Sequence, residues 1–492
     1  MKPPVPPPTR SAERAAPFEA VLGLEVHCQL ATRTKLFCAC PNEFGAPPNT
    51  NVCPVCTAQP GSLPVLNEAA LALGVRAALA LGARVAPRSR FDRKNYFYCD
   101  LPKGFQTSQY AFPLSSGGGL ALASGRTIRL RRIHLEEDAG KATHDRGPRT
   151  LVDLNRAGVP LIEIVSEPDL FSSAEAVEYL ESLKEILQYA GVSECDMEKG
   201  SLRCDVNVSV RRPGEPLRTK VELKNLNSFR NAALAIEHEI ERQVGLYVQG
   251  GPVVQETRLF DVATEKTRSM RSKEDEHDYR YFPEPDLPVA IVGEELLARE
   301  GARVPALPAA RRARYRAEFG LSEQDARVLT SARALADYFE RAAGLADKKS
   351  VANWVANDLL SLLAERRRPA QAIEELGLDP ARLAELVLLV CSGALGTSAA
   401  REVLRAMVDT GKSAAALVGE KGLGQVSDVE TIEGWCRTAL KGKESVVAQV
   451  LAGKEKAIGA LVGPVMKASG GRANPKVVQE TLLRLMKDER GS

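Results

Sequence analysis

The 492-residue chain has no run of about 20 uninterrupted apolar residues, so no membrane-spanning helix is expected. Its first residues, MKPPVPPPTRSAERAAP, also lack the apolar core of a signal peptide. This segment is rich in proline and polar residues, which predicts a disordered or polyproline extension over residues 1–17. We therefore expect a cytoplasmic protein with no membrane partner.

The motifs of several enzyme classes are missing as well. In EDAGKAT, the glycine that a P-loop requires five residues before Gly140 is replaced by Leu135, and no protein-kinase motif set is present. There is no GxSxG elbow and no amidase-like run with a catalytic serine, and Met1 precludes an N-terminal cysteine nucleophile unless the chain is processed. Any ATP site must be of another type, and any ammonia must come from another chain.

The composition is that of a globular protein, with 44% apolar and 26% charged residues and a net charge of only +3. The length suggests about three domains. Residues 18–293 mix short strand-like runs such as VNVSV with few helices. One of these helices is marked by the capping box of Ser172 and Glu175. These features predict an α+β domain with a largely antiparallel sheet.

From residue 294 onward the sequence becomes rich in alanine and leucine with a 3.6-residue repeat, which predicts helices. We expect two all-α domains here, over residues 294–411 and 412–492. From Lys441 to the end, 10 Lys and Arg residues face 5 Asp and Glu residues. This excess is either an ordinary solvated surface or a nucleic-acid contact. The glycine-rich turn in KASGGRANPK, with Lys467, Arg472 and Lys476, favours the second.

Four of the ten cysteines are clustered. Cys38 and Cys40 form one short pair, and Cys53 and Cys56 form another after a loop of twelve residues. A cytoplasmic chain does not favour disulfides, whereas four thiolates at this spacing suit a closed tetrahedral zinc site. Because such a site has no open position, the zinc is expected to hold a loop in place and not to react.

Charged residues recur at alternate positions in several predicted strands, so that they share one face of each strand. One of Glu136 and Glu137 is expected to share a pocket with Glu25 and His27. The other residues of this kind are Glu163, which stands between two isoleucines, the pair Glu222 and Lys224, the set Arg203, Asp205 and Asn207, and the cation Lys94. Carboxylates, one histidine and several cations on a sheet are the groups that Mg²⁺–nucleotide chemistry needs.

Seven longer motifs support this interpretation: GLEVHCQL, FDRKNYFYCDLPKGFQTSQY, HLEEDAGK, LVDLNRAGVPLIEIVSEPD, GSLRCDVNVS, ELKNLNSF and DYRYFPEPDLP. Together they resemble the GatB family, which forms one component of the bacterial glutamyl/aspartyl-tRNA amidotransferases. The resemblance runs from about Phe18 to the end of the chain. It implies a cradle domain with a glutamine-synthetase-like fold, then a helical domain and a YqeY-like tail domain that hold tRNA.

The resemblance also implies an activity. Members of the family use ATP and Mg²⁺ to phosphorylate the side-chain carboxylate of Glu or Asp mischarged on tRNA(Gln) or tRNA(Asn), and ammonia then displaces the phosphate to give the amide. A partner chain, the amidase of the complex, releases the ammonia from glutamine, and a small third chain ties the amidase to the GatB chain. The four cysteines match those members that carry zinc.

Roles for single residues follow from the resemblance. His27, Glu137 and Glu163 are expected to bind Mg²⁺, with Glu25 beside them. The other expected roles are contacts to phosphate or acyl phosphate by Lys94, Lys141, Arg203 and Lys224, and a second metal, nucleotide or ammonia site at Asp205, Asn207 and Glu222.

Two alternatives remain open at this stage. The chain could be a zinc-stapled tRNA-binding scaffold with a degenerate catalytic face, although acids that face RNA phosphates would repel them. It could also be a standalone ligase that takes free ammonia. Dependence of the activity on a glutaminase partner would exclude this alternative.

Overall fold

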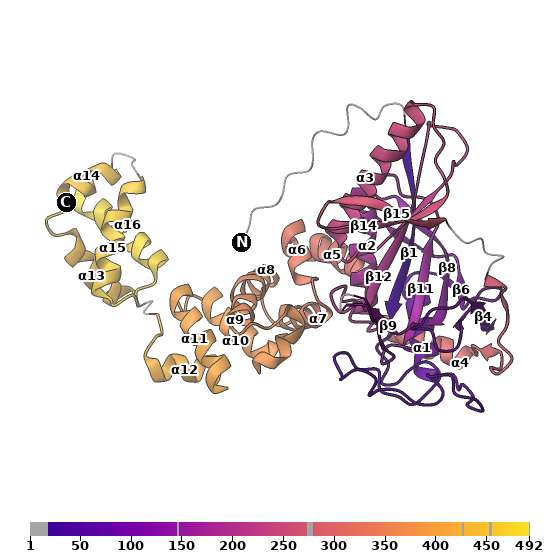
Figure 1. Ribbon diagram of the computed structural model, residues 1–492. Helices are drawn as coiled ribbons and strands as arrows, with labels where there is room; N and C mark the ends of the chain where they lie inside the picture. The colour runs from indigo at the N-terminus through magenta and orange to yellow at the C-terminus, as the bar shows by residue number, and fades with distance from the viewer. Residues whose placement is uncertain (1–17, 145–146, 273–278, 426–427, 452–454, 492) are drawn as a thin grey trace. The chain divides into compact units, whose positions relative to one another are not determined.

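The computed structural model describes residues 18–144, 147–272, 279–425, 428–451 and 455–491 (Figure 1). The chain divides into two compact units, Met1–Leu307 and Pro308–Ser492. The predicted proline-rich extension, residues 1–17, lies outside the described residues. Among the described helices, none combines the length and hydrophobicity needed to cross a bilayer.

A ten-stranded sheet forms the centre of the first unit, in the order β15-β14-β13-β12-β1-β11-β8-β6-β2, with β7 paired to β8. Its pairings are antiparallel except that between β13 and β14, which is parallel. The strands are β1 (Glu19–Gln29), β2 (Arg84–Val85), β6 (Ser115–Ser116), β7 (Gly119–Ala121), β8 (Thr127–Glu137), β11 (Pro160–Ser166), β12 (Leu202–Arg211), β13 (Val221–Lys224), β14 (Glu256–Asp261) and β15 (Lys266–Ser272).

Three smaller sheets accompany the central one, and the three-stranded sheet β16-β4-β5 packs against β8. Their strands are β3 (Arg88–Ser89), β4 (Asp92–Asn95), β5 (Phe105–Ser108), β9 (Lys141–Thr143), β10 (Leu151–Asp153), β16 (Phe282–Pro283) and β17 (Ala290–Ile291). The predicted α+β class with a largely antiparallel sheet is confirmed.

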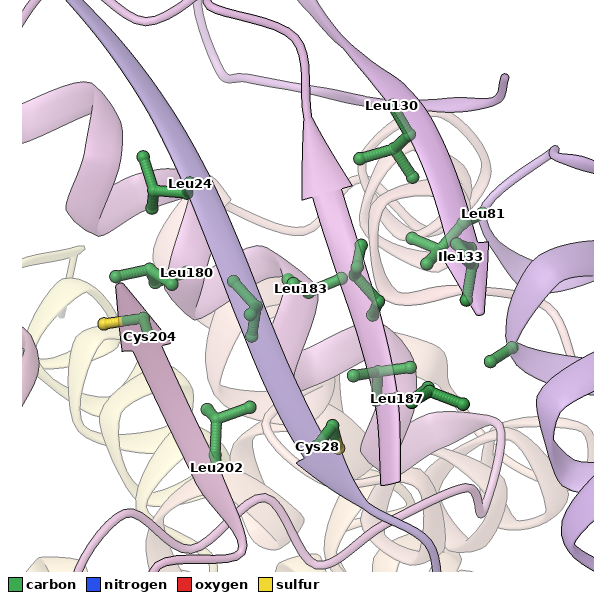
Figure 2. Close-up of a cluster of buried hydrophobic side chains, with 14 of the residues drawn as sticks. Leu24, Cys28, Leu81, Leu130, Ile133, Leu180, Leu183, Leu187, Leu202 and Cys204 are labelled. Atoms are coloured by element: carbon green, nitrogen blue, oxygen red, sulfur yellow. The ribbon is translucent and has the colours of Figure 1, made fainter. Parts of the chain in front are cut away.

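Helices cover one face of the central sheet and bury its apolar side chains. Strand β1 points Leu24 and Cys28 toward this side, where Leu180, Leu183 and Leu187 of a long helix pack beneath the strands (Figure 2). The helices of the first unit are α1 (Glu68–Ala80), α2 (Ser173–Tyr189), α3 (Phe229–Val248) and α4 (Glu294–Arg303). The opposite face of the sheet keeps the polar side chains.

The helix predicted from the capping box is α2. The Ser172 hydroxyl accepts a hydrogen bond from the backbone N–H of Glu175, as the box requires. The Glu175 carboxylate instead accepts from the backbone N–H of Phe171, one residue before the expected donor. Gly191 follows the helix with a φ of 65°, a conformation that favours glycine.

The first compact unit extends to Leu307, whereas the domain expected from the sequence ends at residue 293. Helix α4 packs against α1, and the Arg76 guanidinium donates to the buried Glu300 carboxylate at 2.7 and 2.9 Å. Val304 and Leu307 also contact the first hydrophobic core. Apolar contacts and a buried ion pair therefore keep residues 294–307 in the sheet-containing unit.

The second unit is helical, as predicted, and its described residues form two hydrophobic clusters. The first cluster runs from Tyr315 to Leu417 and the second from Ile432 to Met486. Because Ala414 and Leu417 belong to the first, the division lies after the expected boundary at residues 411 and 412. The elements are α5 (Pro308–Phe319), α6 (Glu323–Leu329), α7 (Arg333–Ala343), α8 (Lys348–Asn353), η2 (Trp354–Leu359), α9 (Leu360–Glu365), η3 (Ala370–Leu376), α10 (Pro380–Cys391), α11 (Thr397–Thr410), α12 (Ala414–Lys421), α13 (Val429–Leu440), α14 (Glu444–Leu451), η4 (Glu455–Ile458), α15 (Gly459–Ala468) and α16 (Pro475–Gly491).

Leu183→Ala should lower the free energy of unfolding of the first unit by about 2–5 kcal/mol, because the substitution leaves a cavity under the sheet. Hydrogen exchange of peptides from β1 and β11 in increasing urea measures the effect. Leu63→Ala is the matched control, since the Leu63 side chain is exposed. Equal protection in the two variants would contradict the central place of α2 in the core.

Candidate functional site

The polar face of the central sheet brings predicted site residues together through strand register. Glu25 and His27 leave β1 on the side opposite the hydrophobic core. The antiparallel pairing sets Glu163 of β11 on one side of His27 and Arg203 of β12 on the other. It also sets Asp205 opposite Glu25. Residues from three strands thus form one polar surface.

Three side chains on this surface can hold a divalent cation: His27, Glu136 and Glu163, whose donor atoms lie within 4.8 Å of one another. The His27 Nε2 atom is 3.6 Å from a Glu136 carboxylate oxygen and 3.7 Å from one of Glu163. In an octahedral site with bonds of about 2.1 Å, adjacent ligand atoms are about 3.0 Å apart and opposite ones about 4.2 Å. The observed separations lie between these values, so the group fits a hard divalent cation such as Mg²⁺.

The structure brings Glu136, and not the expected Glu137, beside His27 and Glu163. Strand β8 stays extended through Glu137, so Glu136 and Glu137 point to opposite sides of the strand. The Glu137 carboxylate accepts hydrogen bonds from the backbone N–H of Thr107 at 2.8 Å and from the Lys103 ammonium. There it lines a separate cavity of about 230 Å³.

His134 is a site residue that the sequence reasoning does not include. It lies opposite Glu163 in the register, is almost fully buried, and places its Nε2 atom 3.2 Å from the Glu163 carboxylate. Burial lowers the pKa of His134, but Glu163 and Glu136 raise it more, to about 9. The resulting imidazolium holds the two carboxylates in position. The signal that could have found it is its two-residue spacing from Glu136.

A second polar group lies beside the first, toward β12 and β13. The Asn207 amide donates to the Glu25 carboxylate at 3.0 Å. The Lys224 ammonium is 2.5 Å from Asp205 and 3.4 Å from Glu222. Burial lowers the pKa of Lys224, but the charges of Asp205 and Glu222 raise it by more, so the pKa lies above its ordinary value. The three residues expected at a second site, Asp205, Asn207 and Glu222, thus lie on the same part of the sheet, where Asn207 contacts Glu25 and the two acids contact Lys224.

Arg203 and Lys94 also reach the polar face. Arg203 donates to the buried Asp138 carboxylate at 2.7 Å. Burial raises the pKa of Asp138, but the charges of Arg203 and of a second arginine lower it more, so the carboxylate stays ionised. The Lys94 ammonium lies 4.8 Å from the centre of the Tyr279 ring. Burial lowers the pKa of Lys94, but Tyr281 and nearby carboxylates raise it above its ordinary value.

Lys141 does not lie on the central sheet. It is the first residue of β9, where it pairs with Asp153 of β10, and its side chain is exposed. The chain leaves the central sheet after Glu137, which carries Lys141 away from the register of β8. In the described part of the chain, the structure shows no contact between Lys141 and the cation-binding group.

The four clustered cysteines come together as predicted. The sulfur atoms of Cys38, Cys40, Cys53 and Cys56 lie within 4.8 Å of one another, and those of Cys53 and Cys56 are 3.9 Å apart. Tetrahedral zinc with bonds of about 2.3 Å requires sulfur separations of about 3.8 Å. A hydrogen bond from Cys38 lowers the pKa of Cys56 to about 4. The cluster therefore fits a structural zinc ion.

A buried lysine supports this cluster. Lys35 is completely shielded from solvent, and its ammonium donates to the Cys56 sulfur at 3.6 Å and to the Leu154 carbonyl at 3.2 Å. A buried cation requires an anionic partner, which a Cys56 thiolate supplies. Lys35 thereby ties the cysteine loop to the segment that leads into β11. Sequence reasoning does not find it because most lysines are exposed.

Two sequence models match the chain. That of the GatB/GatE catalytic domain matches residues 20–298, more than half of the chain, and that of the GatB domain matches residues 337–486. The chain belongs to the GatB family. The first match contains the polar face and the cysteine cluster. The second contains the whole second hydrophobic cluster of the helical unit and the part of the first cluster that follows Leu335.

Relatives of similar length support the assignment to the GatB family. A protein of Thermosynechococcus vestitus is 50% identical, and the alignment covers 97% of this chain and 98% of that protein. Proteins of Thermodesulfovibrio yellowstonii and Myxococcus xanthus are each 48% identical over 96% of this chain, and over 100% and 99% of their own lengths. All three are named as the B component of aspartyl/glutamyl-tRNA(Asn/Gln) amidotransferase.

The basic residues predicted to contact nucleic acid lie at the other end of this GatB-family chain. Lys467 is in the last turn of α15, Lys476 is in the first turn of α16, and Arg472 lies in the loop between them. All three side chains are exposed. One turn therefore presents three cations to solvent.

Purified protein should contain about one zinc ion per chain, and Cys56→Ser should lose most of it because a tetrahedral site needs all four thiolates. Atomic emission after dialysis against a weak chelator measures the zinc content. Cys99→Ser is the matched control, since Cys99 is exposed and lies outside the cluster. Stably folded wild-type protein without zinc would contradict the assignment.

Proposed function

We propose that this chain is the amidating component of a tRNA-dependent amidotransferase. It uses ATP to phosphorylate the side-chain carboxylate of Glu or Asp mischarged on tRNA(Gln) or tRNA(Asn), and ammonia then converts the product to the amide. The observation that carries the proposal is the group of His27, Glu136 and Glu163 on a sheet face that also bears cations. Membership of the GatB family and the names of the relatives support it.

The reaction has two bond-forming steps. In the first, a carboxylate oxygen of the aminoacyl group bonds to the γ-phosphorus of ATP, and the bond from that phosphorus to the ADP oxygen breaks. In the second, the ammonia nitrogen bonds to the acyl carbon, the nitrogen loses a proton, and phosphate leaves. The first step gives a poor electrophile a leaving group, so the protein mainly has to position reactants and neutralise charge.

The residues of the polar face divide this work. A Mg²⁺ ion bound by His27, Glu136 and Glu163 would supply positive charge to phosphate oxygens. His134 holds Glu136 and Glu163 in place through its imidazolium. The Lys94 ammonium is also influenced by the charges of Glu136 and Glu163, so we assign it to the transferred phosphoryl group.

Arg203 and Lys224 are the remaining cations of the proposal. Each already pairs with an acid, Asp138 for Arg203 and Asp205 for Lys224. These pairs keep the cations oriented toward the polar face before a phosphate arrives. The group of Glu25, Asp205, Asn207 and Glu222 provides oxygen ligands for a second cation, the nucleotide or ammonia.

The partners follow from the chemistry and from the family. No glutaminase motif is present in the sequence, so an amidase partner chain supplies the ammonia and a small third chain joins the two. Zinc at the four cysteines stabilises the loop that packs beside the catalytic sheet. Lys467, Arg472 and Lys476 contact the tRNA backbone, in a tail domain that follows a separate helical domain. The complex is assigned to the cytoplasm.

The scaffold alternative fits the polar face less well. Glu25, Glu136 and Glu163 lie on the surface that would have to face RNA phosphates, and carboxylates repel phosphates. An arrangement that only oriented RNA would not need a buried acid, Glu136, and a half-buried one, Glu163, held by a buried histidine.

Glu136→Gln should lower the rate of amide formation by more than about 100-fold, because it removes a charged ligand from the cation-binding group. The assay uses γ-labelled ATP, Mg²⁺ and Glu-tRNA(Gln), with the chain assembled with its amidase partner and the small third chain. Ammonia in place of glutamine isolates the step assigned to this chain. The affinity for tRNA should change by less than about twofold.

The control variant is Glu19→Gln. Glu19 lies at the far end of β1 and pairs with Arg211, so its loss leaves the cation-binding group intact. Near-normal turnover by Glu136→Gln would show that the cation-binding assignment is wrong. Tight tRNA binding by the wild-type complex without ATP turnover would leave only the scaffold.

A further inference from the structure

Two buried cysteines of the first unit face each other on the core side of the central sheet. The sulfur atoms of Cys28 and Cys195 are 3.6 Å apart, and neither residue is exposed to solvent. Cys28 lies on the side of β1 that faces the hydrophobic core, one residue after His27 (Figure 2). Cys195 lies in the segment that joins α2 to β12. Both stand outside the four-cysteine cluster, and the reaction steps described above use neither of them.

The main chain fixes the positions of these two cysteines relative to each other. The N–H of Gln29 donates to the Ser201 carbonyl and the N–H of Ala31 donates to the Val192 carbonyl, both at 2.9 Å. These two hydrogen bonds tie the end of β1 to both ends of the segment that contains Cys195. The sulfurs of a disulfide are about 2.05 Å apart, so each sulfur needs to move by less than about 1 Å, which rotation of the side chains can supply.

The backbone of Cys195 adopts a conformation that residues with a side chain seldom take. Its φ is 51°, in the left-handed region where glycine is the usual residue. The N–H of Cys195 donates to the Ser193 hydroxyl at 3.0 Å, which helps to hold this conformation. Glycine would relieve the strain but would place no sulfur opposite Cys28. A cysteine kept here at a conformational cost favours a chemical role for its sulfur over simple filling of space.

The surroundings of Cys195 make it the more reactive thiol of the two. A hydrogen bond from Cys28 lowers the pKa of Cys195, burial opposes this effect, and Ser193 and the charge of Lys184 lower the pKa further. The thiolate is the form of cysteine that reacts with oxidants. The neighbouring Glu194 is exposed, so only a thin layer of this loop separates the Cys195 sulfur from solvent.

We propose that Cys28 and Cys195 are a site of oxidation, at which a peroxide converts the two thiols into a disulfide. In the first step an oxygen–sulfur bond forms at Cys195, the oxygen–oxygen bond of the peroxide breaks, and the departing oxygen takes the thiol proton. In the second step the Cys28 sulfur bonds to the Cys195 sulfur, the sulfur–oxygen bond breaks, and water leaves with the Cys28 proton. With hydrogen peroxide, two thiols are oxidised and the peroxide is reduced to two waters.

The disulfide changes how firmly the first unit is held together. It joins residues that are 167 positions apart in the chain, on either side of β8, β11 and α2. A cross-link over so long a stretch strongly restricts the unfolded chain and so stabilises the folded one. Because Cys28 points away from the polar face, the cross-link forms on the side of β1 opposite the cation-binding group. The assignment does not depend on the proposed function.

Peptide mapping tests the assignment, because trypsin places each cysteine in a peptide with no other cysteine. Cleavage after Lys and Arg gives residues 15–33 with Cys28 and residues 185–199 with Cys195. The folded full chain, loaded with zinc, is treated with a small excess of hydrogen peroxide, alkylated in denaturant and digested without reductant. We expect the two peptides joined as the main product of this pair, lighter than their sum by two hydrogen atoms, and separated by dithiothreitol.

Cys204→Ala is the matched control, because Cys204 is a buried cysteine of β12 outside the pair, and it should give the same cross-link as wild type. Peroxide should raise the urea midpoint of the first unit by about 0.5 M or more in wild type, and this rise should be absent in Cys195→Ala.

Three results of the map would overturn the assignment: oxygen added at Cys195 without a cross-link, reaction of the exposed Cys99 while the pair stays reduced, or pairing of Cys28 with other cysteines instead. The map of the wild-type chain needs no variant, so it decides even where Cys195→Ala does not fold. Its outcome is separate from that of the amidation assay, which measures the proposed function.

Discussion

Strand β1 carries two incompatible surfaces, and the two-residue repeat of an extended chain keeps them apart. Leu24, Val26 and Cys28 are buried against the helices, while Glu25 and His27 face the other way. A slip of one residue in the pairing of β1 would turn the carboxylate and the imidazole into the apolar core, which would cost several kcal/mol for each unpaired group. One register therefore sets both the hydrophobic core and the candidate active site.

Much of the site can be predicted from alternation within single strands, and the rest cannot. Spacing alone predicts that Glu25 and His27 share a face, and the structure agrees. The choice between Glu136 and Glu137 depends on how β8 pairs with β11, whose residues are distant in sequence, so a local pattern cannot make it. The sequence groups Lys141 with these residues, whereas the structure has it on β9, because the chain leaves the central sheet just before it. The prediction of the α+β class is more reliable than the prediction of single site residues, because the composition and the spacing of apolar residues that support it extend over hundreds of residues.

Three cations of the first unit lie against buried or partly buried anionic groups. His134 lies against Glu163, Arg203 against Asp138, and Lys35 against Cys56. His134 and Lys35 are themselves buried, while Arg203 is partly exposed and its partner Asp138 is buried. The geometry of each pair is established before any ligand arrives. Pairing with a cation thus orients the anionic groups both in the candidate active site and in the cysteine cluster. Cys38 and Cys56 also line the cavity that contains Glu137 and Lys103, so the cysteine loop forms part of the surroundings of β8.

The ion pair between Arg76 and Glu300 has a practical consequence for dividing the chain. Glu300 is completely buried and binds Arg76, with Arg299 and Arg303 on its other side. A gene fragment that stops at residue 293, where composition changes, would remove α4 and leave the Arg76 guanidinium without its carboxylate, a loss typically worth about 3–5 kcal/mol. A catalytic fragment that stops after Leu307 keeps the pair and the apolar contacts of Val304, so excision there preserves the whole first core.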